Sequence, residues 1–331
     1  MQQTDIIIRQ IIILTILGLT GFIAGKTQYL PKESSNILSR FIVKLTTPLL
    51  ILTTMASYSF NRQTVVNGLY IFGFGVFFLS ISLALSFFIS RRLHLKGTAA
   101  NIYSMSSTFG NVVFMAYPLL SALYGDQGII YAIFFNLSND LLLWTLGIYL
   151  VNRHNNAKWK DNLRHLVNGN TVAFVLGILL TVINFHGFVG TNPVAGKVYR
   201  VINDALNPLG KTTIYISMVF IGLILSQIKI GGIKGLIERY PHFVLALFKL
   251  MIIPAFAFLV LSVLGALPDP FIKKIVVLQL GMPTGTIIAA LANQYDSDDK
   301  FATEGIFVTT VLSVVTLPLF AYAVEYIKLF N

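Results

Sequence analysis

The residues best suited to bind a small molecule lie in two polar stretches inside apolar sequence. The first is "SMSSTFGNVVFMAYPLLSALYG" at residues 104–125, and the second is "MPTGTIIAALANQYDSD" from residue 282. A proline in each predicts a broken helix, whose freed N–H groups and positive N-terminal end attract an anion. Such a break persists at bilayer depth only where it lines a cavity or is wrapped in protein. The candidate substrate-binding residues are Asn111, Tyr117, Pro118, Met282, Pro283, Thr284 and Gly285.

A few charged side chains fall inside apolar runs. Asp140 shares a helix face with Asn136, four residues earlier. An acid within a membrane span is by default a proton or cation site, so this pair is the ion-coupling candidate. The equally supported alternative is a structural acid paired with Lys44 or Lys249. Lys44 could attract an anion, but for Lys44, Lys249 and Lys211 we favour side chains that extend to the membrane surface.

The composition is that of an integral membrane protein. Of the 331 residues, 55% are hydrophobic and 11% charged, and the mean hydropathy is +0.76, whereas soluble domains carry about 25% charged residues. The absence of cysteine excludes disulfides and thiolate chemistry. The histidines lack metal-ligand spacing, so no metal or cofactor is expected. Basic residues flanking spans account for the net charge of +11 without nucleic acid.

Apolar runs of about 20 residues, the length that crosses a bilayer, predict an all-α protein with ten transmembrane helices. The fourth and ninth are expected to be broken, at Pro118 and at Met282-Pro283. An interfacial helix over 196–206 is expected before the seventh. The expected spans cover residues 6–25, 37–57, 65–90, 98–125, 128–151, 171–185, 209–226, 243–267, 274–294 and 301–329.

Charge and matching breaks predict how these spans are organised. The odd-numbered connections hold fourteen lysines and arginines, against seven on the other side, so the odd side is expected in the cytoplasm and both termini outside. The polar segment 152–170 is then a cytoplasmic connection between two halves, 1–151 and 171–331. Because each half has five spans, the halves enter from opposite sides, so any internal repeat is inverted, with broken helices in matching places.

At these residues the chain resembles the auxin efflux carrier family, which includes plant PIN-type carriers and bacterial malate or malonate permeases. "GNVVFMAYPLLSALYG" and "MPTGTIIAALANQYDSD" resemble its two crossover segments, and "VNGNTVAFVLGILL" resembles the start of its sixth span. The resemblance implies that the broken helices cross, and it implies a scaffold of spans 1, 2, 6 and 7, a transport domain of spans 3–5 and 8–10, elevator-like motion and a homodimer. Asn168 and Asn170 match the family motif and are expected to fix the backbone where the sixth span begins.

Together these features predict a secondary transporter of small organic anions in a plasma membrane, not an enzyme. The carboxylate would lie between Asn111 and the N–H groups of the breaks, and a proton or sodium ion could supply the driving force. A channel-like facilitator and a sodium-coupled bile-acid-type symporter are the alternatives. A membrane enzyme would need convergent catalytic groups, and the sequence offers no Ser/His/Asp set.

Overall fold

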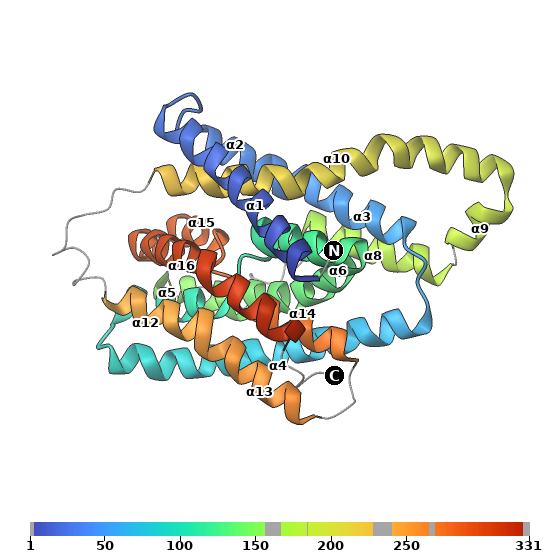
Figure 1. Ribbon diagram of the computed structural model, residues 1–331. Helices are drawn as coiled ribbons and strands as arrows, with labels where there is room; N and C mark the ends of the chain where they lie inside the picture. Colours follow the sequence, from blue (N-terminus) through green and yellow to red (C-terminus); the bar gives the residue numbers. More distant parts are fainter. Residues whose placement is uncertain (1–2, 156–166, 184, 228–239, 265–268, 327–331) are drawn as a thin grey trace. The chain divides into compact units, whose positions relative to one another are not determined.

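A computed structural model shows an α-helical protein (Figure 1). It describes residues 3–155, 167–183, 185–227, 240–264 and 269–326. Within these ranges there is no β-strand, only an isolated bridge between two loops. The helical stretches long and apolar enough to cross a membrane are Ser34–Ser57, Arg62–Arg92, Val112–Val151, Pro193–Ser226, Tyr240–Val263 and Asp299–Glu325. The expected all-helical class is therefore confirmed.

The helices follow the predicted apolar runs closely in both parts of the chain. The N-terminal part contains α1 (Gln3–Lys26), α2 (Ser34–Phe41), α3 (Thr47–Ser57), α4 (Arg62–Arg92), α5 (Gly97–Thr108), α6 (Tyr117–Leu142) and α7 (Ile148–Val151). The C-terminal part contains α8 (Gly169–Val182), α9 (Phe185–Thr191), α10 (Pro193–Ser226), α12 (Tyr240–Leu247), α13 (Ile253–Val263), α14 (Pro270–Leu280), α15 (Ile287–Gln294) and α16 (Asp299–Tyr326).

Some of the predicted element boundaries differ from the structure or lie outside the described residues. The expected interfacial helix over 196–206 is not separate, because α10 runs through Pro208 as one helix of 34 residues. Within α6, Gly125 has φ 60° and ψ −145°, so the fourth and fifth expected spans meet at this glycine. Most of the connection 152–170 and the far ends of the eighth and tenth spans lie outside the described residues.

Short π-helical turns precede three prolines. The turns η1 (Ile42–Thr46), η2 (Val112–Ala116) and η6 (Phe248–Ile252) each end two residues before a proline. Proline lacks an N–H and its ring clashes with the carbonyl four residues back. A wider π-turn moves that carbonyl away, so the helix passes through the proline without breaking.

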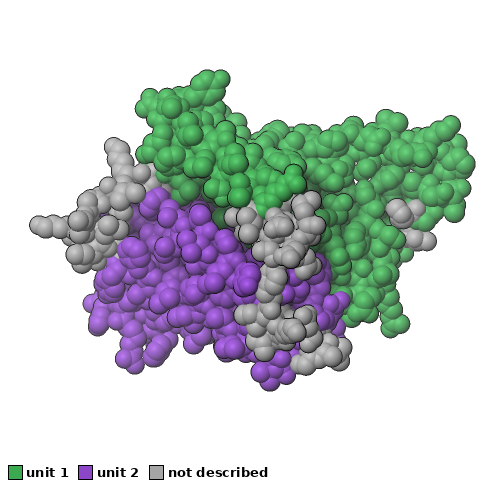
Figure 2. Space-filling model, viewed as in Figure 1, with its two compact units in different colours: residues 1–68, 113–133, 167–228 green, residues 69–112, 134–166, 229–331 purple. Residues whose placement is uncertain are grey.

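Contacts divide the chain into two compact units, coloured in Figure 2. Unit 1 contains residues 1–68, 113–133 and 167–228, and unit 2 contains residues 69–112, 134–166 and 229–331. Each unit has its own helix packing.

Unit 1 is built on helices that approach closely. α1 packs along α10, and α3 packs on both α8 and α10 (Figure 1). A Cβ atom added to Gly222 would lie 1.8 Å from the Gly18 carbonyl oxygen, and one added to Gly21 would lie 1.9 Å from the Val219 oxygen. Small residues permit this backbone-to-backbone contact. Within a membrane the hydrophobic effect does not drive helices together, and close packing at small residues is what holds them.

Unit 2 gathers its helices around α5 and α16. α16 packs against α5, α12, α14 and α15, and α5 also contacts α7 and η6. The side chains enclosed here are largely apolar, including Leu250, Ile275 and Ile306. The two non-helical breaks that follow α5 and α14, over 109–111 and 281–286, both lie within this unit.

Candidate functional site

The two helix breaks pair with each other inside unit 2. α5 ends at Thr108 and the chain is non-helical over 109–111, while α14 ends at Leu280 and the chain is non-helical over 281–286. Asn111 N donates to Pro283 O at 2.8 Å, and Gly285 N donates to Phe109 O at 3.1 Å. These bonds form the antiparallel bridge between Gly110 and Thr284. Four backbone groups of the two breaks, the N–H groups of Asn111 and Gly285 and the carbonyls of Phe109 and Pro283, are thereby paired, as a low-dielectric interior favours.

The close pairing explains the glycines of the crossover. A Cβ atom on Gly285 would lie 2.9 Å from the Gly110 carbonyl oxygen, so a larger residue would push the two loops apart. On the other side, Thr284 Oγ1 donates to Ser106 O at 2.8 Å and Thr284 N donates to Thr309 Oγ1 at 3.1 Å. Thr284 therefore joins the end of α5 to α16.

The first break is displaced from the predicted position. We expected it at Pro118, but helix resumes at Val112 through the π-turn η2 and continues into α6, where Pro118 is the second residue. The expectation was wrong because the π-turn accommodates the proline. Tyr117 and Pro118 are both buried and belong to unit 1, whereas Asn111 belongs to unit 2. The second break is confirmed at Met282-Pro283.

Asn111 carries an unused hydrogen-bond donor. Its side chain is 2% exposed, and Nδ2 has no partner among the described residues. The Ser106 hydroxyl, at the end of α5, is likewise buried without a partner. A structural asparagine would donate its side-chain amide to carbonyls of the break, but two of these carbonyls, Phe109 O and Pro283 O, accept backbone N–H groups of the facing loop instead. An unpaired buried donor is costly, typically about 1–3 kcal/mol, so Asn111 is suited to receive an acceptor from a ligand.

Asp140 and Asn136 share a helix face as predicted. Asn136 Nδ2 donates to Asp140 Oδ2 at 3.1 Å, and Asp140 is half-buried in unit 2. The ion pairs among the described residues do not include Asp140. The alternative ion pair between Asp140 and Lys249 is therefore not present in the described structure.

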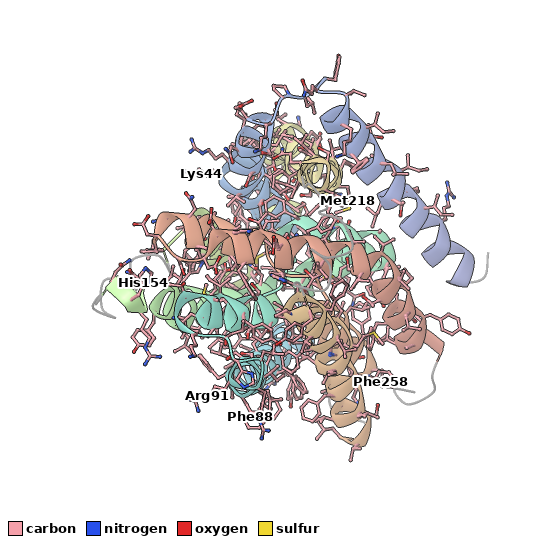
Figure 3. All side chains as sticks on the ribbon, turned by 90° about the vertical axis from the view of Figure 1, so that its left-hand side faces the viewer. Lys44, Phe88, Arg91, His154, Met218 and Phe258 are labelled. Carbon is pink, nitrogen blue, oxygen red and sulfur yellow. The ribbon has the colours of Figure 1, made fainter. Side chains whose placement is uncertain are left out.

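Lys44, Lys211 and Lys249 differ in their exposure and in their partners. Lys44 lies in η1 and is exposed on the outside of the blue helices of unit 1 (Figure 3). Lys211 forms an ion pair with Asp126 at 3.6 Å. Lys249 was expected to reach the membrane surface, and that was wrong: it is 2% exposed and its Nζ donates to Thr108 O at 3.0 Å.

Position in the span could have identified Lys249 from sequence. It lies six residues after Phe243, where the expected eighth span begins, a distance of about 9 Å along a helix. A lysine that deep is too far from the surface to extend there, so a buried role was the better expectation.

Other polar residues have structural partners. Asn168 Oδ1 accepts from Asn170 N at 3.0 Å and Thr171 N at 3.1 Å, which confirms that Asn168 fixes the start of the sixth span. His242 lies 3.9 Å from Glu304. Arg91 and His154 (Figure 3), with Arg153, line a pocket in unit 2 that includes none of the predicted binding residues.

Comparison with known proteins decides the family. The model of the family described as "Membrane transport protein", which comprises the auxin efflux carriers, matches residues 6–321. The chain belongs to this family. A transporter of Methanocaldococcus jannaschii, named as uncharacterized, is 24% identical over 322 residues, covering 94% of this chain and 97% of its own. One of Methanothermobacter thermautotrophicus, also named uncharacterized, is 24% identical over 306 residues, covering 92% and 94%.

Family membership establishes the general role. The auxin efflux carrier family is a transporter family, so the chain is a multi-pass membrane transport protein that moves a small molecule across a lipid bilayer. The paired breaks lie in the two stretches by which the sequence resembles the family's crossover segments.

Proposed function

We propose that this chain is a secondary active transporter of small organic anions, with carboxylates such as malate and malonate as first candidates. The observation that carries this is the buried Asn111 Nδ2, which has no hydrogen-bond partner among the described residues, beside two helix breaks whose backbones bond to each other. The substrate carboxylate accepts from Asn111 Nδ2 and from N–H groups at the start of α15, beyond Thr284 and Gly285. The first N–H groups of a helix have no internal partner and lie at its positive end.

The proposed architecture is ten spans in two inverted repeats of five. The two compact units support a further division into a scaffold and a transport domain: unit 1 contains spans 1, 2, 6 and 7, the proposed scaffold, together with residues 113–133, and unit 2 contains most of the proposed transport domain. Alternating access would come from elevator-like movement of the transport domain against the scaffold, in a homodimer. In the plasma membrane both termini would be outside and the connection 152–170 cytoplasmic.

Asp140 is proposed as the coupling site. Its carboxyl has an amide partner, Asn136, and no basic partner among the described residues. A carboxyl in this setting can exchange a proton without breaking an ion pair. Lys44, being exposed in its π-turn, would attract an anion from solution and not hold it in a buried site.

The test is uptake of radiolabelled malate and malonate into proteoliposomes, with thermal-shift measurements on a panel of mono- and dicarboxylates. Asn111→Asp should lower uptake and apparent affinity by about tenfold or more, which corresponds to about 1.4 kcal/mol. The variant keeps the size of the side chain but replaces the donor with a carboxylate that repels the anion. Asn293→Asp, at an exposed position in the same unit, should leave uptake within about twofold.

Further outcomes separate the alternatives. Stabilisation only by non-anionic ligands, or full activity in Asn111→Asp, would reject the anion site. A carrier shows counterflow, in which unlabelled substrate inside drives accumulation of label, whereas a channel-like facilitator does not. Uptake that requires sodium would instead indicate a sodium-coupled symporter of the bile-acid type.

A further inference from the structure

The partial negative charge at the C-terminal end of α5 is neutralised by side-chain donors from other segments. The last carbonyls of a helix have no internal partner and carry its partial negative charge. Here Thr284 Oγ1 donates to Ser106 O at 2.8 Å, and Ser82 Oγ donates to Ser107 O at 3.2 Å. Lys249 Nζ donates to Thr108 O at 3.0 Å. Two donors are neutral hydroxyls, and the third is a side chain that can carry a full positive charge.

Lys249 has no carboxylate beside it among the described residues. The turn η6 packs against α5, α12, α13 and α16, and of these only α16 carries acids. Glu304 faces His242 at 3.9 Å, seven residues before Lys249 and about 10 Å away along the helix. Glu325 pairs with Lys274 at 2.7 Å. The carbonyl of Thr108 is thus the acceptor that the described structure gives to this buried ammonium.

The position matters because carbonyls at the C-terminal end of a broken helix are where carriers with such helices bind a coupling cation. An ammonium group bears the same charge as Na⁺ and binds the same oxygen ligands by hydrogen bonds. We propose that Lys249 is the resident cation of the crossover. Its ammonium holds the place that an inorganic cation would otherwise occupy, so that the neighbouring anion site has a fixed positive charge and needs no Na⁺.

This inference concerns the same site as the proposed function, but its test needs no substrate. The melting temperature (Tm) of the purified full-length protein would be measured in choline, sodium and ethylammonium chloride at equal ionic strength. Wild type should have the same Tm in all three. Lys249→Ala should melt lower in choline and regain about 2–4 °C or more with ethylammonium or sodium, because the vacated helix end accepts the added cation.

Two further variants separate charge from hydrogen bonding. Lys249→Arg keeps the cation and should not respond to added salt cations. Lys249→Gln keeps an N–H donor for Thr108 O but no charge, so it should respond as Lys249→Ala does. Lys96→Ala, at an exposed lysine of the α4–α5 connection, should match wild type.

Several results would overturn the inference, and they do not depend on every variant folding. Stabilisation of wild type by sodium over choline would show that the site is not already filled. If Lys249→Gln has the wild-type Tm and that Tm does not change with added cations, then Lys249 acts only as a hydrogen-bond donor. Loss of carboxylate uptake alone would bear on the proposed function and leave this result unchanged.

Discussion

At the scale of single residues, the crossover depends on side chains that replace lost helical hydrogen bonds. Thr284 binds both Ser106 O and Thr309 Oγ1, and Lys249 binds Thr108 O. A neutral hydrogen bond of this kind contributes about 1 kcal/mol net, and a cation at a helix C-terminus contributes up to about 2 kcal/mol when partly buried. The side-chain nitrogen of Asn111, Nδ2, has no hydrogen-bond partner among the described residues, which makes it available to a ligand.

Proton coupling through Asp140 gives a prediction at this scale. An inward proton gradient should accelerate carboxylate uptake by wild type, because a carboxyl that loads a proton on one side can release it on the other. Asp140→Asn is permanently neutral and should lose that acceleration while keeping counterflow. The measurement is uptake of labelled malonate or malate with and without an imposed pH gradient.

The control for Asp140 is another titratable group of the same unit. His242→Gln removes the histidine paired with Glu304 and should keep the gradient dependence. If Asp140→Asn responds to the gradient as wild type does, the coupling proposal for Asp140 fails.

Residue types predicted part of the site and missed part of it. Asn111 and the Met282–Gly285 stretch stood out because polar and small residues are rare in apolar runs, and the structure pairs the two breaks there. Lys249 was misread because a lysine near a span end and one at mid-depth look alike when only composition is considered. Its partner, Thr108, is distant in sequence, so the contact itself could not be read from either segment.

At the scale of elements, the helices were largely predictable and their local distortions were not. Apolar runs of spanning length located the helices because membrane insertion imposes that length. Pro118 was expected to break a helix, since a proline removes one hydrogen bond, but a π-turn absorbs it, as at Pro48 and Pro254. A proline in an apolar run therefore does not by itself show whether the helix breaks there or only widens into a π-turn.

Close packing of α1 on α10 provides a prediction for these elements. Gly222→Ala places a methyl group 1.8 Å from the Gly18 carbonyl oxygen, which neither backbone can avoid without moving apart. Overpacking of this kind costs about 1–3 kcal/mol, and for a chain of this length we expect Tm to fall by about 1–4 °C. Differential scanning fluorimetry of the purified protein measures it.

Gly73→Ala is the matched control for that helix contact. Gly73 lies in α4, and a Cβ atom added there meets nothing within 4 Å. Alanine is favoured over glycine in a helix by about 1 kcal/mol, so this variant should melt at or above the wild-type temperature. Equal stability of Gly222→Ala and wild type would mean that α1 and α10 do not approach as described.

At the scale of the whole molecule, the two compact units draw on segments far apart in sequence. Unit 1 takes residues from the start, the middle and the second half of the chain, and unit 2 takes the residues between and after them. This interleaving could not be derived from apolar runs, which locate helices without saying which of them pack together. The predicted halves, 1–151 and 171–331, are the copies of a predicted repeat, whereas the compact units are groups of helices that pack together. Both divisions can therefore apply to the same chain.

Membrane orientation is the property of the whole chain that is most directly testable. The excess of basic residues predicts that the α4–α5 connection lies in the cytoplasm and the α3–α4 connection outside, at opposite ends of the 31-residue α4. Because the chain has no cysteine, Ser59→Cys and Lys96→Cys, both at exposed positions, report cleanly. A membrane-impermeant maleimide should label Ser59→Cys in intact cells and Lys96→Cys only after permeabilisation, with the cysteine-free parent unlabelled. The reverse pattern would contradict this orientation and place the α4–α5 connection outside.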